Sequence, residues 1–163
     1  MPDRIRIALV KSLRGEHAHV KPLIALEALT AAQARQRPRR GLATIWEQLA
    51  HMVFWQDIML ARLRGEAPPY PKSAADGWPP MPPARDAVAE WADLVAHFAN
   101  GLKTAQRFAK TTDLARIIRT KTKRTTVEQL IALAQHNSYH VGQIVTVRRM
   151  LGLWPPPSGG DTW

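Results

Sequence analysis

Apolar residues recur at three- and four-residue intervals in four long stretches of the chain, a spacing that places them on one face of an α-helix. In the third stretch, Trp91, Val95, Phe98 and Leu102 follow this spacing. The four predicted helices, with approximate ends, span residues 3–13, 42–64, 85–110 and 126–151, and the first resumes at 23–29 after a break at Gly15. Strand signals are almost absent, and only residues 114–119 could form a short extended piece.

Helix-ending and helix-starting residues agree with these boundaries. Gly65 and Gly152 follow the second and fourth stretches, where a glycine commonly ends a helix. Thr125 or Thr126 can serve as the N-cap of the last helix, and Pro22 suits a first helical turn. The sequence therefore predicts an all-α protein.

Residues 66–84 form an unusual connection between the second and third helices. Seven of the 13 prolines in the chain lie there, so this segment can form neither a helix nor an inner strand. An extended segment of this length can span about 50 Å, which is enough to return along a helix. We therefore expect one domain over residues 1–163, a four-helix bundle in up-down-down-up order with a long proline-rich crossover between helices two and three. The tail, with Trp154 and Trp163, is expected to fold back onto the bundle.

Composition narrows the classes of function. There is no cysteine, so disulfides, thiolate metal ligands and a cysteine nucleophile are excluded. No apolar run is long enough to span a bilayer, and the first residues turn charged before a signal-peptide core could form. We accordingly expect no membrane association and a cytoplasmic location.

The formal net charge of +10 raises the question of nucleic-acid binding. The basic residues gather in two predicted interhelix connections and near the end of the last helix, and no recognition helix, zinc finger or aromatic-basic motif accompanies them. We therefore expect no sequence-specific nucleic-acid partner. A solvated basic surface is the favoured interpretation, with attraction of an anionic substrate as an alternative.

The most informative pattern is a pair of histidines, His136 and His140, one helical turn apart and therefore on one face. His51 lies in the second predicted helix and supplies a third imidazole. Three neutral imidazoles with an open position are the ligand set of a catalytic metal site, and imidazole favours zinc or nickel over magnesium. The competing interpretation is that these are solvated or hydrogen-bonded core histidines. The position of the pair beside the apolar stripe favours a shared metal, since buried imidazoles need partners.

Other polar residues near this pattern have weaker claims to a function. Gln143 lies one turn past His140 and could orient a ligand, although an interhelix hydrogen bond is the simpler role. Glu47, one turn before His51, could act as a base or as a helix-start acid. The residue after His136 is not glutamate, so the HExxH peptidase pattern is absent. For the remaining candidates we expect packing, outer-shell or surface roles: Asn137, Tyr139, His17, His19, His97, Trp46, Trp55, Trp78 and Trp91.

Taken in order, the Ile-Trp-Glu-Gln-Leu-Ala-His51 segment, the Asp-Gly-Trp-Pro loop at 76–79 and the His-Asn-Ser-Tyr-His-Val-Gly-Gln helix at 136–143 resemble the DinB-like family. The resemblance covers nearly the whole chain. It implies a four-helix bundle in up-down-down-up order that commonly dimerises, and a divalent metal held by three histidines, here His51, His136 and His140. The family shares its fold with bacillithiol S-transferases and mycothiol-dependent maleylpyruvate isomerase, which use low-molecular-weight thiols.

Three classes of function follow. The leading expectation is a metal-dependent, thiol-dependent transferase acting on a small electrophilic molecule. A metal-dependent hydrolase is the second, because an open metal position can also activate water. The third is a bundle that binds a metal or a partner without catalysis. The catalytic residues are not predicted by the sequence.

Overall fold

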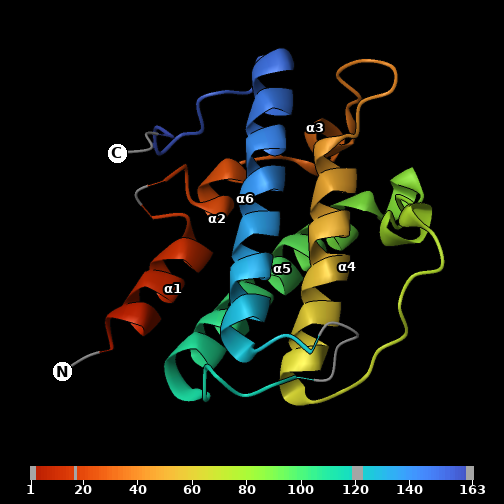
Figure 1. Cartoon of the computed structure of the whole chain (residues 1–163). Helices are drawn as coiled ribbons and strands as arrows, with labels where there is room; N and C mark the ends of the chain where they lie inside the picture. Colours follow the sequence, from red (N-terminus) through yellow and green to blue (C-terminus); the bar gives the residue numbers. More distant parts are fainter. Residues whose placement is uncertain (1–2, 17, 119–122, 161–163) are drawn as a thin grey trace.

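The computed structural model describes residues 3–16, 18–118 and 123–160, which are largely helical (Figure 1). The elements are α1 (Arg4–Arg14), α2 (Pro22–Ala25), α3 (Ala31–Arg35), α4 (Ile45–Arg64), the 3-10 turns η1 (Ala74–Gly77) and η2 (Ala84–Asp86), α5 (Ala87–Thr111) and α6 (Thr126–Met150). Within these ranges the β interactions amount to one isolated bridge between Ile117 and Thr125. The all-α prediction is thus confirmed.

Local sequence signals set the ends of the long helices. Thr44 begins α4 with a capping box, in which its hydroxyl accepts from the Glu47 N–H while the Glu47 carboxylate accepts from the Thr44 N–H. Thr125 and Glu128 form the same arrangement at the start of α6. Gly65 ends α4 in the left-handed conformation at φ 93°, which glycine adopts without steric cost.

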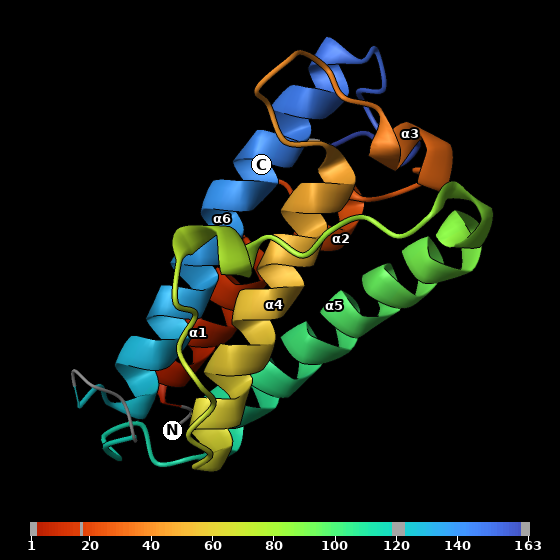
Figure 2. The same ribbon diagram turned by 90° about the vertical axis from the view of Figure 1, so that its right-hand side faces the viewer.

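The four long helices surround a common core. Helix α4 packs against α5 and α6, and α1 also packs against α5 and α6. In Figure 1, α1 and α6 rise from the bottom of the view, whereas α4 and α5 both descend. The proline-rich crossover makes this possible: Figure 2 shows residues 65–86 climbing along α4 from its lower end to the upper end of α5.

The core has two parts, one at each end of the helices. Trp46 and Trp91 anchor the first, with ring centroids 5.3 Å apart, and the Trp91 indole donates to the Leu29 carbonyl at 2.8 Å. Leu13, Leu63 and neighbouring residues of α5 and α6 fill the second. The described helices include none that is long and apolar enough to cross a membrane.

The segment after α1 differs from the predicted helix over 23–29. Helix α2 ends at Ala25, Ala28 takes a left-handed φ of 56°, and a further capping box from Thr30 to Gln33 starts α3. The buried Arg148 of α6 holds this bend, because its Nη1 donates to the carbonyls of Ala25 and Glu27 at 3.0 and 3.1 Å. Sequence periodicity could not show a turn whose carbonyls are satisfied from a distant helix.

The tail returns to the helices, as expected, over its described residues up to 160. Trp154 packs against the first part of the core, and the Ser158 backbone N–H donates to the Glu27 carboxylate at 3.1 Å. Trp163 lies outside the described residues.

Candidate metal centre

Helices α4 and α6 bring His51, His136 and His140 together. One ring nitrogen of each lies within 4.8 Å of the other two. The Nε2 atoms of His51 and His136 are 3.2 Å apart, although 85 residues separate them in sequence. The ring centroids lie 4.6–5.1 Å from one another. The sequence prediction that these three side chains converge is therefore met by the geometry.

The outer nitrogens of two of these rings are fixed by oxygen acceptors. Nδ1 of His51 donates to the Gly77 carbonyl at 2.6 Å. Nδ1 of His140 lies 2.6 Å from the amide oxygen of Gln48 and 3.0 Å from that of Gln143. Because an oxygen acceptor requires the proton on Nδ1, the neutral rings carry their lone pairs on Nε2.

Burial keeps the three imidazoles neutral. It lowers the pKa of His51, and burial together with the neighbouring imidazoles of His140 and His51 lowers the pKa of His136 to about 4. Burial and the proximity of His51 likewise lower the pKa of His140 to about 4. Neutral imidazole is the form that binds a metal, so the three side chains could act as ligands at neutral pH.

The crossover covers one side of the cluster. Trp78 stacks on His51 with the ring centroids 4.0 Å apart and the planes 18° from parallel. Gly77, which supplies the carbonyl to His51, lies close to Trp55, because a Cβ there would be 3.0 Å from the indole nitrogen and the indole would have to shift. The sequence predicted Trp78 as a loop anchor but did not predict its contact with His51 or the role of Gly77.

Gln48 is the residue in contact with the cluster that sequence reasoning missed. It lies three residues before His51, and its amide oxygen is the nearer of the two acceptors for His140. A signal was present, since i and i+3 side chains share a helix face. The outer-shell role considered for Gln143 agrees with its 3.0 Å contact.

Glu47, Asn137 and Tyr139 do not join the cluster. The Glu47 carboxylate caps Thr44 and pairs with Arg37 at 2.6 Å, which supports the helix-start interpretation. Desolvation raises the pKa of Glu47, but the hydrogen bonds and charge of Arg37 and the capping bonds outweigh it, so that the net pKa is lowered. Asn137 is buried next to His136, and Tyr139 is 66% exposed at the cluster's edge.

The remaining histidines lie elsewhere. His97 is exposed and pairs with Asp57 at 2.9 Å, in agreement with the expected surface position. His19 is held by contacts of both ring nitrogens, one with the Val20 carbonyl at 2.7 Å and one with the Ser138 hydroxyl at 2.8 Å. His17 lies outside the described residues.

The donor set fits a divalent cation. The Nε2 lone pairs of His51 and His140 and the Nε2 atom of His136 face one small space. A cation there would relieve the repulsion between the lone pairs. The hydrogen bonds from Nδ1 to oxygen are the usual means by which proteins orient imidazole ligands. The three histidines could thus hold one metal ion.

The family model described as the DinB superfamily matches residues 17–144 of this chain, and the protein belongs to that superfamily. The match includes all three clustered histidines and the crossover. No curated protein and no solved structure matches the chain.

Proposed function

We propose that His51, His136 and His140 bind one divalent metal ion, with zinc or nickel favoured over magnesium. The observation that supports this is the convergence of three neutral imidazoles, two of which direct Nδ1 outward: His51 to the Gly77 carbonyl and His140 to the Gln48 amide oxygen. Imidazole is a borderline ligand that suits zinc and nickel, whereas magnesium prefers oxygen.

The reaction we propose is thiol-dependent transfer to a small electrophilic molecule, with a low-molecular-weight thiol as co-substrate. A divalent ion in this site would act as a Lewis acid and favour the deprotonation of a thiol or of water at neutral pH. The chain itself would contribute the orientation of His51 by Gly77 and of His140 by Gln48 and Gln143, and exclusion of water by the Trp78 indole. The superfamily supports this choice by resemblance only.

Hydrolysis without a thiol is the second candidate, because the same acidity can serve water. A bundle that binds a metal or a partner without catalysis is the third. Metal-loaded protein should be screened against small electrophiles with glutathione, bacillithiol and mycothiol, and against esters and amides without thiol. Turnover that requires both metal and thiol supports transfer, turnover that requires metal alone supports hydrolysis, and bound metal without turnover supports the non-catalytic bundle.

Metal binding has a direct test. Untagged protein should be purified and its metal content measured, beside His140→Ala and His97→Ala. We expect about one ion per chain in the wild type and in His97→Ala, whose histidine is exposed and outside the cluster, and strong depletion in His140→Ala. Equal metal content in all three proteins would refute the assignment.

We further propose that residues 1–163 act as one domain, an up-down-down-up four-helix bundle that functions in the cytoplasm as a homodimer. The common direction of α4 and α5 supports the bundle order, and family resemblance supports the dimer. Light scattering at micromolar concentration tests the dimer, and a monomeric mass would exclude it. Any binding to DNA should be weak, indifferent to sequence and lost with added salt, which a salt titration with two unrelated duplexes can check.

A further inference from the structure

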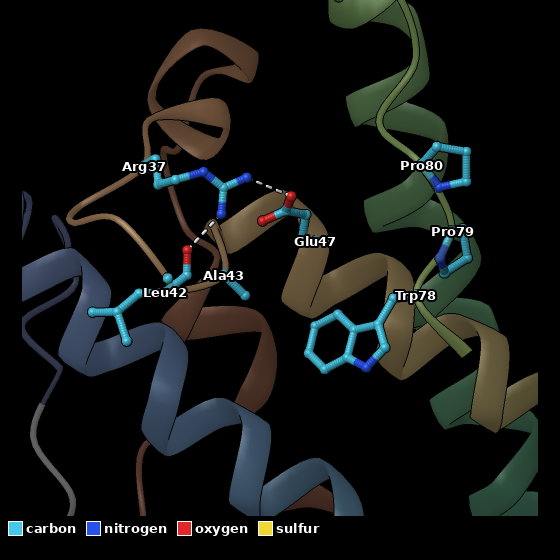
Figure 3. Close-up of a pocket in the computed structure, with 8 residues that line it drawn as sticks. Arg37, Leu42, Ala43, Glu47, Trp78, Pro79 and Pro80 are labelled. Carbon is cyan, nitrogen blue, oxygen red and sulfur yellow. Dashed lines mark hydrogen bonds and ion pairs between the residues drawn. The ribbon is translucent and has the colours of Figure 1, made fainter. Parts of the chain in front are cut away.

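A pocket of about 360 Å³ opens beside the three-histidine cluster. Figure 3 shows its two walls. One is the loop before α4, which contributes Arg37 and Leu42, and the other is the crossover, which contributes Trp78, Pro79 and Pro80. Glu47, in the first turn of α4, also lines the pocket.

Arg37 is held in place but retains donors. Its Nη1 donates to the Leu42 carbonyl at 2.5 Å and its Nη2 donates to the Glu47 carboxylate at 2.6 Å. A guanidinium group has five N–H donors, so three remain, and 43% of the side chain is exposed. A fixed guanidinium loses little further freedom when it binds an anion.

The charge near the pocket favours an anion over a cation. Between Glu27 and Glu47 the sequence has no acidic residue, whereas four arginines lie there: Arg35, Arg37, Arg39 and Arg40. Glu47 is already committed, because one carboxylate oxygen pairs with Arg37 and the other accepts from the Thr44 N–H at 2.7 Å. A cationic ligand could use Glu47 only by disrupting the cap of α4.

Trp78 joins this pocket to the histidine cluster. Its indole lines the pocket and also stacks on His51. Glu47 in the pocket lies one helical turn before His51, which places their side chains on the same face of α4. A flat apolar group resting against the indole and the neighbouring prolines would therefore contact the same ring that stacks on His51.

We propose that this pocket binds the substrate of the three-histidine centre, and that the substrate is a small organic carboxylate with a flat apolar body. The carboxylate binds Arg37, and the apolar body packs against Trp78, Pro79 and Pro80. This assignment of a substrate class rests on the proposed function, but the anion-binding pocket can be tested without any turnover.

The test is a titration with 2-naphthoate and its neutral amide, 2-naphthamide, followed by calorimetry in metal-free and zinc-loaded protein. Naphthoate should bind the wild type at least about tenfold more tightly than the amide, since one hydrogen bond to a charged group contributes this much. Arg37→Gln should remove that difference. Arg64→Gln is the matched control, because Arg64 forms a comparable exposed ion pair with Glu66 at the far end of α4. It should bind naphthoate as the wild type does.

Two further variants guard against misfolding as the explanation. Arg37→Lys keeps the charge and should retain part of the preference for the acid, and Trp78→Phe should weaken both probes. Equal affinities for acid and amide in the wild type, or equal losses in Arg37→Gln and Arg64→Gln, would overturn the pocket assignment. Metal content of the same samples separates the two proposals: acid-selective, Arg37-dependent binding in a protein that binds no metal would overturn the proposed metal function and its substrate assignment, leaving only the anion pocket.

Discussion

The amide oxygen of Gln48 lies 2.6 Å from Nδ1 of His140. This contact links α4 to α6 through a side chain that is not one of the three histidines. This contact fixes the ring tautomer of His140 and its orientation. Gln143 approaches the same nitrogen at 3.0 Å, so the ring is held from its own helix and from the opposite one.

We predict that Gln48→Leu weakens zinc affinity by about tenfold, within the range seen when outer-shell partners of metal ligands are lost. Gln48→Glu, which keeps an oxygen acceptor, should stay near the wild type or bind more tightly. Competition with a chromophoric chelator measures both affinities. Unchanged affinity in Gln48→Leu would show that Gln143 alone suffices to orient the ring.

The fit between the crossover and α4 can be tested at Gly77. A Cβ at this position would lie 3.0 Å from the Trp55 indole nitrogen and 3.5 Å from the next ring atom. Gly77→Ala should therefore shift the carbonyl that accepts from His51, destabilise the protein by about 1–2 kcal/mol and weaken metal binding. Chemical denaturation and the same chelator competition report the two effects.

Gly142→Ala is the control for that variant. Gly142 lies inside α6 with no atom near the added Cβ, so alanine should stabilise the protein by about 0.5–1 kcal/mol through its higher helix propensity. If Gly77→Ala behaves like Gly142→Ala, the close approach of the crossover has no energetic importance.

Metal-free protein should lose stability on acidification. The pKa values of His136 and His140 are lowered to about 4 in the folded state, from an ordinary value of 6.5. Between these pH values the unfolded chain binds more protons than the folded one. Stability is thus complete above about pH 6.5 and falls as the pH decreases toward 4, by an amount on the order of a few kcal/mol.

Urea denaturation at a series of pH values, with a chelator present, measures this dependence. His136→Asn should show a shallower loss between pH 6.5 and 4 because one of the lowered groups is gone. His97→Asn removes an exposed histidine and should leave the slope unchanged. A flat profile for the wild type would show that the clustered imidazoles become protonated without cost.

Arg148 should be the most sensitive arginine among the described residues with respect to stability. It is 3% exposed, and besides the Ala25 and Glu27 carbonyls it donates to the Leu153 carbonyl at 3.0 Å. Arg148→Met leaves these acceptors without a donor and should cost about 3 kcal/mol. Within the part of the chain that the structure describes, the neighbouring Arg149 contacts the Trp154 ring alone, so Arg149→Met should cost less than about 1 kcal/mol. Similar losses in both variants would contradict this role of Arg148.

The sequence predicted the long helices and the convergence of the histidines because both depend on periodic signals. Spacing places His136 and His140 on one face, and apolar periodicity turns α4 toward α6. Residue spacing cannot predict which side chain a non-helical segment will contact. The Gly77 carbonyl reaches His51 only because 3-10 turn η1, held by the Asp76 carboxylate accepting from the Lys72 and Ser73 N–H groups, sets the path of the chain.

The same reasoning explains the missed bend after α1. Residues 23–29 carry a helical pattern, but the chain turns at Ala28 because Arg148, about 120 residues further on, satisfies the freed carbonyls. Gln48 was missed for a different reason. Glutamine is common on helix surfaces, and only the position of α6 distinguishes this one.

The anchoring of the crossover through residues 72–78 divides that segment into two parts with unequal tolerance of length change. The Tyr70 ring lies 5.9 Å from that of Trp55 and ties residue 70 to α4, so insertions of a few glycines before Tyr70 should lengthen the path at a small entropic cost. An insertion between Asp76 and Trp78 would displace both the Gly77 carbonyl and the Trp78 indole from His51. The length of this crossover is therefore expected to be tolerant of change at its beginning, whereas the spacing from the turn to Trp78 is constrained by the contacts of Gly77 and Trp78 with His51.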